Sequence, residues 1–290
     1  MRLNAGTARS LFQPTKPTNP VLVPDVFEGF RDTSAIVTGA SSGIGQAIAV
    51  SLAHAGVSRL LIHYCQNRQG AEQTAAAVEP FGCEASLLAA DLSSGDDRHR
   101  LVETAFERLG NLQTWVNNAG ADVLTGDAAS LDFDAKLRRL IDVDVVGTIQ
   151  LSRLVAQRLL EQESKLPPSI AFIGWDQAPC GMEGDAGQMF GTVKAAVMAF
   201  AASLAQTLAP HVRVNTIAPG WIQTSWGESS SDYWNDRAKD QSLMHRWGQP
   251  GDVARAVLFA TDPENTFLTG QTIDINGGWN RQSPSNRPGR

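Results

Sequence analysis

Short apolar runs alternate with longer segments of helical spacing through most of this chain. The apolar runs predict strands at 35–37, 59–64, 85–90, 114–117, 169–173, 212–217 and 271–275. Between them, apolar residues at helical spacing predict helices at 43–55, 71–81, 97–109, within 133–161, 188–208 and 252–260. This alternation is typical of βαβ units. The pattern therefore predicts an α/β fold with one doubly wound parallel sheet of about seven strands and helices on both faces.

Both ends of the chain depart from this pattern. Residues 1–32 are rich in Pro, Thr and Asn and predict an irregular arm, and residues 281–290 predict a second tail. One domain is expected over residues 33–280. Within it, residues 221–249 are long, mixed and aromatic, with Trp221, Trp226, Tyr233, Trp234 and Trp247. Such a segment at the carboxyl ends of parallel strands suits a substrate lid, although ordinary surface packing is an alternative.

Composition narrows the classes of partner. With 290 residues and 42% hydrophobic content the chain can bury a large core. A net charge of −6 without a basic run argues against nucleic-acid binding. The three cysteines are scattered without metal-ligand spacing, so we expect no metal site and reduced thiols. We see no secretory signal and no apolar run of the roughly 20 residues that span a bilayer, so we expect a cytoplasmic protein without a membrane partner.

A glycine-rich segment, Thr38-Gly39-Ala40-Ser41-Ser42-Gly43-Ile44-Gly45, follows the first predicted strand and opens a helix. Glycines permit a tight turn there and let phosphates approach the backbone, while the helix N-terminus offers free N–H groups. The segment therefore predicts a dinucleotide site. Its expected contact residues are Gly39, Ser41, Ser42, Gly43, Ile44 and Gly45.

Four further segments carry a family resemblance. Asn117-Asn118-Ala119-Gly120 follows the fourth strand, Asp91-Leu92 the third and Pro219-Gly220-Trp221-Ile222-Gln223-Thr224 the sixth, and Thr269-Gly270-Gln271 with Asn276-Gly277-Gly278 closes the domain. Together with the glycine-rich segment they resemble the short-chain dehydrogenase/reductase family over about residues 33–278. The resemblance implies a single-domain Rossmann fold and an NAD(P)-dependent oxidoreductase. It also implies further cofactor contacts at Asp91, Leu92, Asn118, Ala119, Gly120, Lys194, Pro219, Gly220, Ile222 and Thr224.

The end of the second strand bears on the choice of cofactor. NAD sites place an acidic residue there, which would repel a 2′-phosphate. Here the segment reads His63-Tyr64-Cys65-Gln66-Asn67-Arg68 and contains no acid. Arg68 could pair with the phosphate, with Asn67 and Tyr64 nearby. We therefore expect NADP(H), while NAD stays possible if Arg68 is only a solvated charge.

The sequence departs from the family's pattern at the catalytic positions. The family uses a Tyr to exchange the proton, a Lys to lower its pKa and hold the nicotinamide ribose, a Ser to bind the substrate oxygen, and an Asn to anchor a relay water. This chain keeps Lys194, but Phe190 stands at the Tyr position, Trp175 at the Ser position and Asp144 at the Asn position. No Ser or Thr lies between Gly174 and Met189. Asp144 could pair with Lys194, and such a pair could equally be structural.

Asp176 follows Trp175 directly and is the candidate replacement acid. A carboxyl group in an apolar, Trp-flanked pocket can have a raised pKa. The pteridine-reductase branch of the family also carries an Asp at the Ser position, although it keeps the Tyr. An iminium substrate would need no acid at the hydride step, and the tryptophans could stack on a flat or cationic ligand. A small carbonyl or a C=N, pterin-like compound is therefore the expected substrate.

Three functions stay open on the sequence. The first is an NADP(H)-dependent oxidoreductase with an altered proton donor. The second is a catalytically silent NADP(H)-binding protein, and the third is a non-redox enzyme on this fold. Assembly is implied only by resemblance: the family's two long helices, here within 133–161 and 188–208, usually pack into homo-dimers and homo-tetramers.

Overall fold

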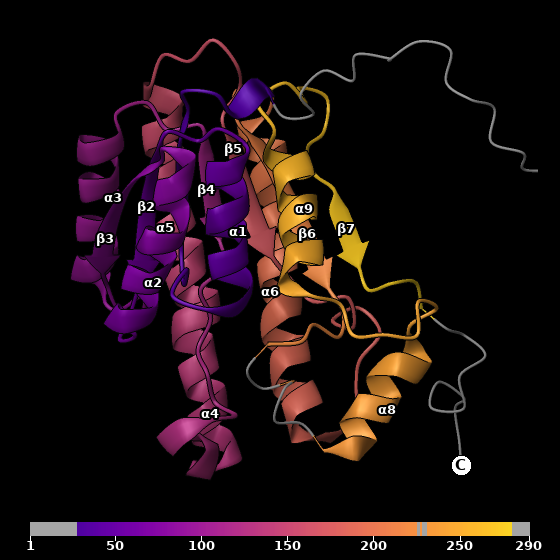
Figure 1. The fold of residues 1–290 in the computed structure, drawn as a ribbon. Coiled ribbons are helices and arrows are strands. Elements are labelled where there is room, and N and C mark those ends of the chain that lie inside the picture. The colour runs from indigo at the N-terminus through magenta and orange to yellow at the C-terminus, as the bar shows by residue number, and fades with distance from the viewer. Residues whose placement is uncertain (1–27, 225–226, 228–230, 280–290) are drawn as a thin grey trace, which may run out of the picture.

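Seven parallel strands form one sheet in the computed structural model, which describes residues 28–224, 227 and 231–279 (Figure 1). The strands run β3-β2-β1-β4-β5-β6-β7 across the sheet. Their bounds are Ser34–Val37 for β1, Arg59–Tyr64 for β2, Glu84–Ala89 for β3, Thr114–Asn117 for β4, Ser169–Ile173 for β5, Arg213–Pro219 for β6 and Thr272–Ile275 for β7. The predicted doubly wound fold is confirmed, and the strand order reverses between β1 and β4.

Two apolar layers cover the faces of this sheet. On one face lie α1 (Gly43–His54), α2 (Arg68–Val78) and α9 (Pro250–Thr261), which share a buried cluster with β1 and β2. On the other lie α3 (Gly95–Leu109), α5 (Thr148–Glu161) and α6 (Gly184–Leu208), which pack around Trp115 and Phe172. Because both faces are covered, the central strands β1, β4, β5 and β6 are buried at every position, which explains their continuous apolar runs.

The predicted helix within 133–161 is divided into three parts. It begins as α4 (Phe133–Leu140), widens into a π-helix at Ile141–Gly147 (η4), and continues as α5. A Cβ on Gly147 would lie 2.5 Å from the carbonyl oxygen of Leu92, so the chain passes close to the end of β3 there. Hydrophobic spacing did not predict this change, because a short π-helix inside a longer helix has no distinct apolar period of its own.

The segment expected to form a lid contains a helix that the sequence analysis did not predict. This helix, α8 (Asp232–Gln241), lies beyond the carboxyl ends of the strands (Figure 1). It is polar apart from its aromatic residues, so no apolar period marks it. Trp226 lies outside the described residues.

Short 3₁₀ turns complete the fold, at Glu28–Phe30, Glu79–Phe81 and Gly126–Ser130. Phe30 belongs to the region expected as an irregular arm, yet its side chain is fully buried in the core. Residues 1–27 and 280–290, with the rest of the arm and the C-terminal tail, lie outside the described residues. Among the described helices, α6 is long and apolar enough to cross a membrane by length and composition, and it packs here against β6 and α5.

Candidate active site

A cleft of about 780 Å³ opens at the carboxyl ends of β1 to β4, where the strand order reverses. Ligands of doubly wound proteins bind at this point, and ligand pockets span about 300–1,000 Å³. The cleft is lined by the predicted Gly39, Ser41, Ser42, Gly43, Ile44, Gly45, Asn67, Asp91, Leu92, Asn118, Ala119, Gly120 and Thr224. The structure therefore brings most of the predicted cofactor residues together.

The glycine loop has the close approaches that its sequence implies. Gly39 has a φ of 63°, and a Cβ there would lie 2.8 Å from the Cα of Ala119. A Cβ on Gly45 would lie 2.2 Å from the carbonyl oxygen of Gly39. The Asn118 Nδ2 donates to the carbonyl oxygens of Thr38 and Gly39, both at 3.0 Å, and fixes the loop. The loop then enters α1, whose first N–H groups are free to bind an anion such as a phosphate.

His63 supports the same loop, although the sequence analysis gave it no role. Its Nδ1 accepts from the Gly39 N–H at 3.1 Å, and its Nε2 lies 3.0 Å from the carbonyl oxygen of Ala90. This arrangement requires the neutral ring with the proton on Nε2. Burial lowers the pKa of His63 to about 4, so the ring stays neutral near pH 7. The sequence does not reveal this supporting role of His63, because its hydrogen-bond partners follow other strands.

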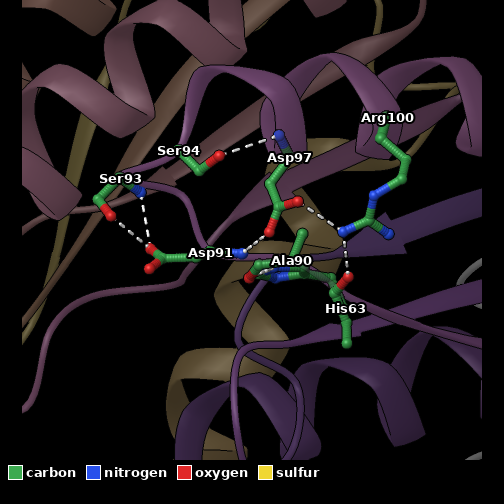
Figure 2. Close-up of polar contacts among 8 residues, drawn as sticks. His63, Ala90, Asp91, Ser93, Ser94, Asp97 and Arg100 are labelled. Carbon is green, nitrogen blue, oxygen red and sulfur yellow. Dashed lines mark hydrogen bonds and ion pairs between the residues drawn. The ribbon is translucent and has the colours of Figure 1, made fainter.

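A polar network orders the end of β3, where the resemblance places the adenine ring (Figure 2). The backbone N–H of Asp91 donates to Asp97 at 2.7 Å, and Arg100 donates to the same carboxylate at 2.7 Å. These bonds hold the pKa of Asp97 below its usual value. One carboxylate oxygen of Asp91 accepts from the N–H and hydroxyl of Ser93. The other accepts no bond within the described part of the chain and is open to a ligand.

At the end of β2, only one of the three residues expected near the 2′-phosphate lines the cleft. Asn67 caps α2 by accepting from the Gly70 N–H at 2.9 Å, and it also lines the cleft. Arg68 is the first residue of α2, is 73% exposed, and its Nε donates to Glu72 at 2.8 Å. Tyr64 is buried in the core. Neither Tyr64 nor Arg68 is among the residues that line the cleft.

Two arginines that the sequence analysis missed line the opposite wall. Arg138 and Arg139 lie on α4 and face the cleft together with Asp142 of the π-helix. Two adjacent arginines on an exposed helix are usually solvated surface charges. Only their position in the fold identifies them as possible ligand-binding residues.

Lys194 and Asp144 form an ion pair beside the loop after β4, and neither is among the residues that line the cleft. The Lys194 Nζ lies 3.3 Å from Asp144 Oδ2, and the Asp144 side chain is only 2% exposed. The other oxygen, Oδ1, accepts from the Ala121 N–H at 2.7 Å. The pair considered from the sequence is therefore present, and it joins the π-helix to α6. The buried Asp144 carboxylate is therefore paired with the half-buried Lys194 and also fixes the loop after β4.

Phe190 and Trp175, which the sequence analysis expected at the family's Tyr and Ser positions, lie on α6 and beside it, respectively. Phe190 is half-buried and packs against a small cluster around Val123, Leu140 and Met189. Trp175 is half-buried, and a Cβ on Gly191 would lie 3.7 Å from its Cζ3 atom. The indole thus lies beside α6, one residue after Phe190. Both side chains are aromatic and half-buried, so they add apolar surface beside α6.

Asp176 sits between the ends of β5, β6 and β7. Its N–H donates to the carbonyl oxygen of Pro219 at 3.1 Å, and its Oδ2 accepts from Asn276 at 3.0 Å. Its Oδ1 is buried without a hydrogen-bond partner. Burial raises the pKa of Asp176 to about 6, with a further contribution from the charge of Asp274 and opposition from the Asn276 bond. This carboxyl can therefore be protonated at pH values near 6, well above the usual range of an Asp.

The segment after β6, which the sequence analysis expected to form a lid, carries several aromatic residues. Pro219 ends β6, and Ile222 is mostly buried. Neither these residues nor Gly220 are among those that line the cleft, although Thr224 reaches it. The rings of Trp221 and Trp234 lie 5.9 Å and 5.3 Å from the guanidinium of Arg237. Arg237 is buried and forms an ion pair with Glu183, which precedes α6. The lid aromatics therefore stack on a cation of the chain itself.

Comparison with known proteins agrees with this geometry. A family profile described as "Enoyl-(Acyl carrier protein) reductase" matches residues 39–280. A 3-oxoacyl-[acyl-carrier-protein] reductase of Synechocystis is 32% identical over 249 residues, which cover 84% of this chain and 95% of that protein. A FabG enzyme of the same description from Staphylococcus epidermidis is 29% identical over 84% of this chain and 98% of its own length.

Solved structures show the same likeness. A short-chain dehydrogenase/reductase of Brucella melitensis superposes with a TM-score of 0.74 at 31% identity, covering 87% of this chain and 98% of that one. A short-chain dehydrogenase of Burkholderia cenocepacia, in complex with NADP, gives 0.75 at 27% identity, covering 86% and 98%. The cleft, the glycine loop and these relatives together show that the chain belongs to the short-chain dehydrogenase/reductase family of oxidoreductases.

Proposed function

We propose that the protein is an NADP(H)-dependent oxidoreductase whose proton donor is not the family's tyrosine. The observation that carries the proposal is Lys194, which stays in place beside an intact cofactor cleft while Phe190 removes the phenol. The NADP complex of the Burkholderia relative supports the cofactor, and the absence of an acid at Cys65-Gln66-Asn67 supports the 2′-phosphate.

The residues suggest a division of labour. A bound reduced nicotinamide supplies the hydride. Lys194, by resemblance, would hold the nicotinamide ribose, and Asp144 would keep its ammonium charged and oriented. Phe190 and Trp175 would exclude water and offer flat apolar faces to the substrate.

The substrate follows from the proton balance. A carbonyl that accepts hydride becomes an alkoxide and must take one proton, which Asp176 could donate before recovering one from solvent. An iminium that accepts hydride becomes a neutral amine and takes no proton at that step. We therefore propose a small carbonyl or, more sharply, a C=N or pterin-like substrate. The 3-oxoacyl reductase relatives support carbonyl chemistry, and Phe190 favours the imine.

The test is turnover of an imine panel by the wild-type protein and by Asp176→Asn. The proposal predicts NADPH oxidation with imines, and loss of ketone reduction in the variant. Full activity of Asp176→Asn on every substrate would remove Asp176 from the mechanism. Imine and ketone turnover are measured with the same NADPH concentration, so a binding defect would appear equally in both.

A second candidate is a silent NADP(H)-binding protein. The packing of Phe190 into the cluster of Val123, Leu140 and Met189 favours it, because this contact gives Phe190 a purely structural use. Cofactor binding without hydride transfer to any acceptor would favour this candidate. A non-redox reaction that uses Asp144 and Asp176 is the remaining alternative.

Location and assembly are proposed on the same resemblance. We propose a cytoplasmic enzyme that forms a homo-dimer or homo-tetramer through the α4–α5 and α6 helices. Several large apolar side chains on η4, α5 and α9 are exposed in the single chain and are available for such contacts, namely Ile141, Val146, Leu160 and Phe259. Light scattering of the purified protein tests the assembly.

A further inference from the structure

Arg68 is poorly placed for the role that its sequence position suggests. Its side chain is 73% exposed and turns along α2 to Glu72, with which it forms an ion pair at 2.8 Å. It does not line the cleft, although its neighbours Gln66 and Asn67 do. Among the residues that the structure describes, the wall of the cleft at the end of β2 therefore carries no positively charged side chain. A cation that pairs with an anionic ligand has to come from another part of the cleft.

The opposite wall supplies that cation. Arg138 and Arg139 project from α4 onto the cleft, and neither has an ion-pair or hydrogen-bond partner within the described part of the chain. The field of Arg139 extends to both sides of the opening. Its charge opposes the rise that burial and Asp91 impose on the pKa of Cys65. It also helps the hydrogen bonds from Thr125 and Leu124 to lower the pKa of Asp122 against the effect of burial.

Three carboxylates also line the cleft and could compete for this charge. Asp122 is occupied by the N–H groups of Leu124 and Thr125 and by the Thr125 hydroxyl. Asp91 is partly occupied by Ser93. Asp142 follows Arg138 and Arg139 on the same helical run and forms no ion pair with either. The guanidinium of Arg139 is thus available to a ligand.

We infer that Arg139, from the wall opposite β2, pairs with a phosphate of the bound cofactor in place of Arg68. The inference rests on the proposed NADP(H) function and names the residue that selects its cofactor. Guanidinium groups pair with phosphate through two parallel hydrogen bonds, which makes them selective for it. The 2′-phosphate is the expected partner, because Cys65, Gln66 and Asn67 surround its position and carry no charge of their own.

The experiment titrates NADPH and NADH into the whole protein, read by energy transfer from its seven tryptophans to the reduced nicotinamide. The variants are Arg139→Ala, Arg139→Lys and Arg68→Ala. Arg153→Ala is the matched control, since it removes an exposed arginine from α5 that does not line this cleft. We expect Arg139→Ala to weaken NADPH about tenfold or more and NADH less than about twofold, as loss of a charge-assisted contact implies.

The other outcomes are equally informative. Arg139→Lys should retain part of the preference, and Arg68→Ala and Arg153→Ala should change neither constant. An equal loss for NADPH and NADH in Arg139→Ala would support pairing with the pyrophosphate instead of the 2′-phosphate. Unchanged binding in Arg139→Ala, or a larger loss in Arg68→Ala, would overturn the inference alone. Failure of the folded wild-type protein to bind either cofactor would overturn the proposed function and the inference with it.

Discussion

The adenosine end and the nicotinamide end of the cleft differ in how closely they match the pattern of the short-chain dehydrogenase/reductase family. At the adenosine end, Gly39, Gly45 and Asn118 keep the spacing and contacts that a dinucleotide loop requires. At the nicotinamide end, the resemblance keeps Lys194 at its motif position and places Phe190, Trp175 and Asp144 at the positions of the groups that the family uses for proton transfer. The difference teaches that binding and chemistry are separable on this fold. Binding depends on backbone geometry that tolerates little change, whereas chemistry depends on a few exchangeable side chains.

The largest effect is expected from Gly45→Val at the adenosine end. The Cβ would lie 2.2 Å from the Gly39 carbonyl oxygen and 2.5 Å from Asn118 Nδ2, so the loop must shift. Overpacking of this kind costs about 1–3 kcal/mol, and the shift destroys the phosphate cradle. NADPH titration should show a loss of about 100-fold or more.

Gly251→Ala is the control for this change. Gly251 lies in the first turn of α9, and nothing stands within 4 Å of an added Cβ. NADPH binding and unfolding should stay as in the wild type. Unchanged binding in Gly45→Val would mean that the glycine loop does not hold the cofactor.

The second effect concerns the nicotinamide end and the coupling of Phe190 to Asp144. Phe190→Tyr alone should restore little ketone reduction, because Asp144 neutralises the lysine that would lower the pKa of the new phenol. Phe190→Tyr with Asp144→Asn should exceed the single variant by about tenfold or more, within the 10² to 10⁴ that a general acid supplies. Ketone-dependent NADPH oxidation measures this, and equal activity of the two variants would show that Asp144 does not restrain Lys194.

A third prediction uses the pH dependence of stability. The pKa of Asp176 rises from 3.8 to about 6 on folding, so the folded state binds more protons between these values. Asp176 therefore favours folding fully below pH 3.8, and this contribution is lost as pH rises through 6. If Asp176 were fully buried, this pKa change would contribute about 3 kcal/mol to the free energy of unfolding. Because the side chain is partly exposed, we expect a contribution of about 2 kcal/mol.

Asp176→Asn is the comparison that isolates this effect. Denaturant unfolding at pH 4 to 7 should show the wild type losing stability relative to the variant as pH rises. His63 acts in the opposite direction, since burial lowers its pKa to about 4 and its contribution falls as pH drops below 6.5. Because His63 is present in both the wild type and Asp176→Asn, its contribution cancels in the difference between their free energies of unfolding. A constant difference across this range would mean that the Asp176 carboxyl does not titrate there.

The smallest effect is expected in the lid. Glu183→Gln weakens the ion pair with the buried Arg237, at a cost of about 1–2 kcal/mol to the lid contacts. Glu103→Gln, which weakens the exposed pair with Arg158, is the control and should cost less than about 1 kcal/mol. Tryptophan fluorescence during unfolding reports the lid through Trp221 and Trp234. Equal costs in the two variants would show that Arg237 does not anchor the lid.

The sequence predicted the parts of this molecule that depend on local pattern. Strands 59–64, 114–117 and 169–173 have the predicted bounds, because buried parallel strands form continuous apolar runs. The π-helix at Ile141–Gly147 and the polar helix α8 were not predictable from hydrophobic spacing. The candidate site shows the same limit. Lys194 and Asp144 were identifiable by motif position, whereas Arg139 and His63 depend on which elements the fold brings together.

The most direct test of the account is NADPH oxidation by the wild-type protein with a cyclic iminium and with a 3-oxoacyl thioester, each at saturating cofactor. The account predicts hydride transfer to the iminium, and ketone reduction that is slower by about 10² or more because the phenol is absent. Rapid reduction of the thioester that persists in Asp176→Asn would contradict it, because a proton donor other than Asp176, as effective as the family's tyrosine, would then exist. No reduction of either compound by protein that binds NADPH would also contradict it, in favour of a silent binding protein.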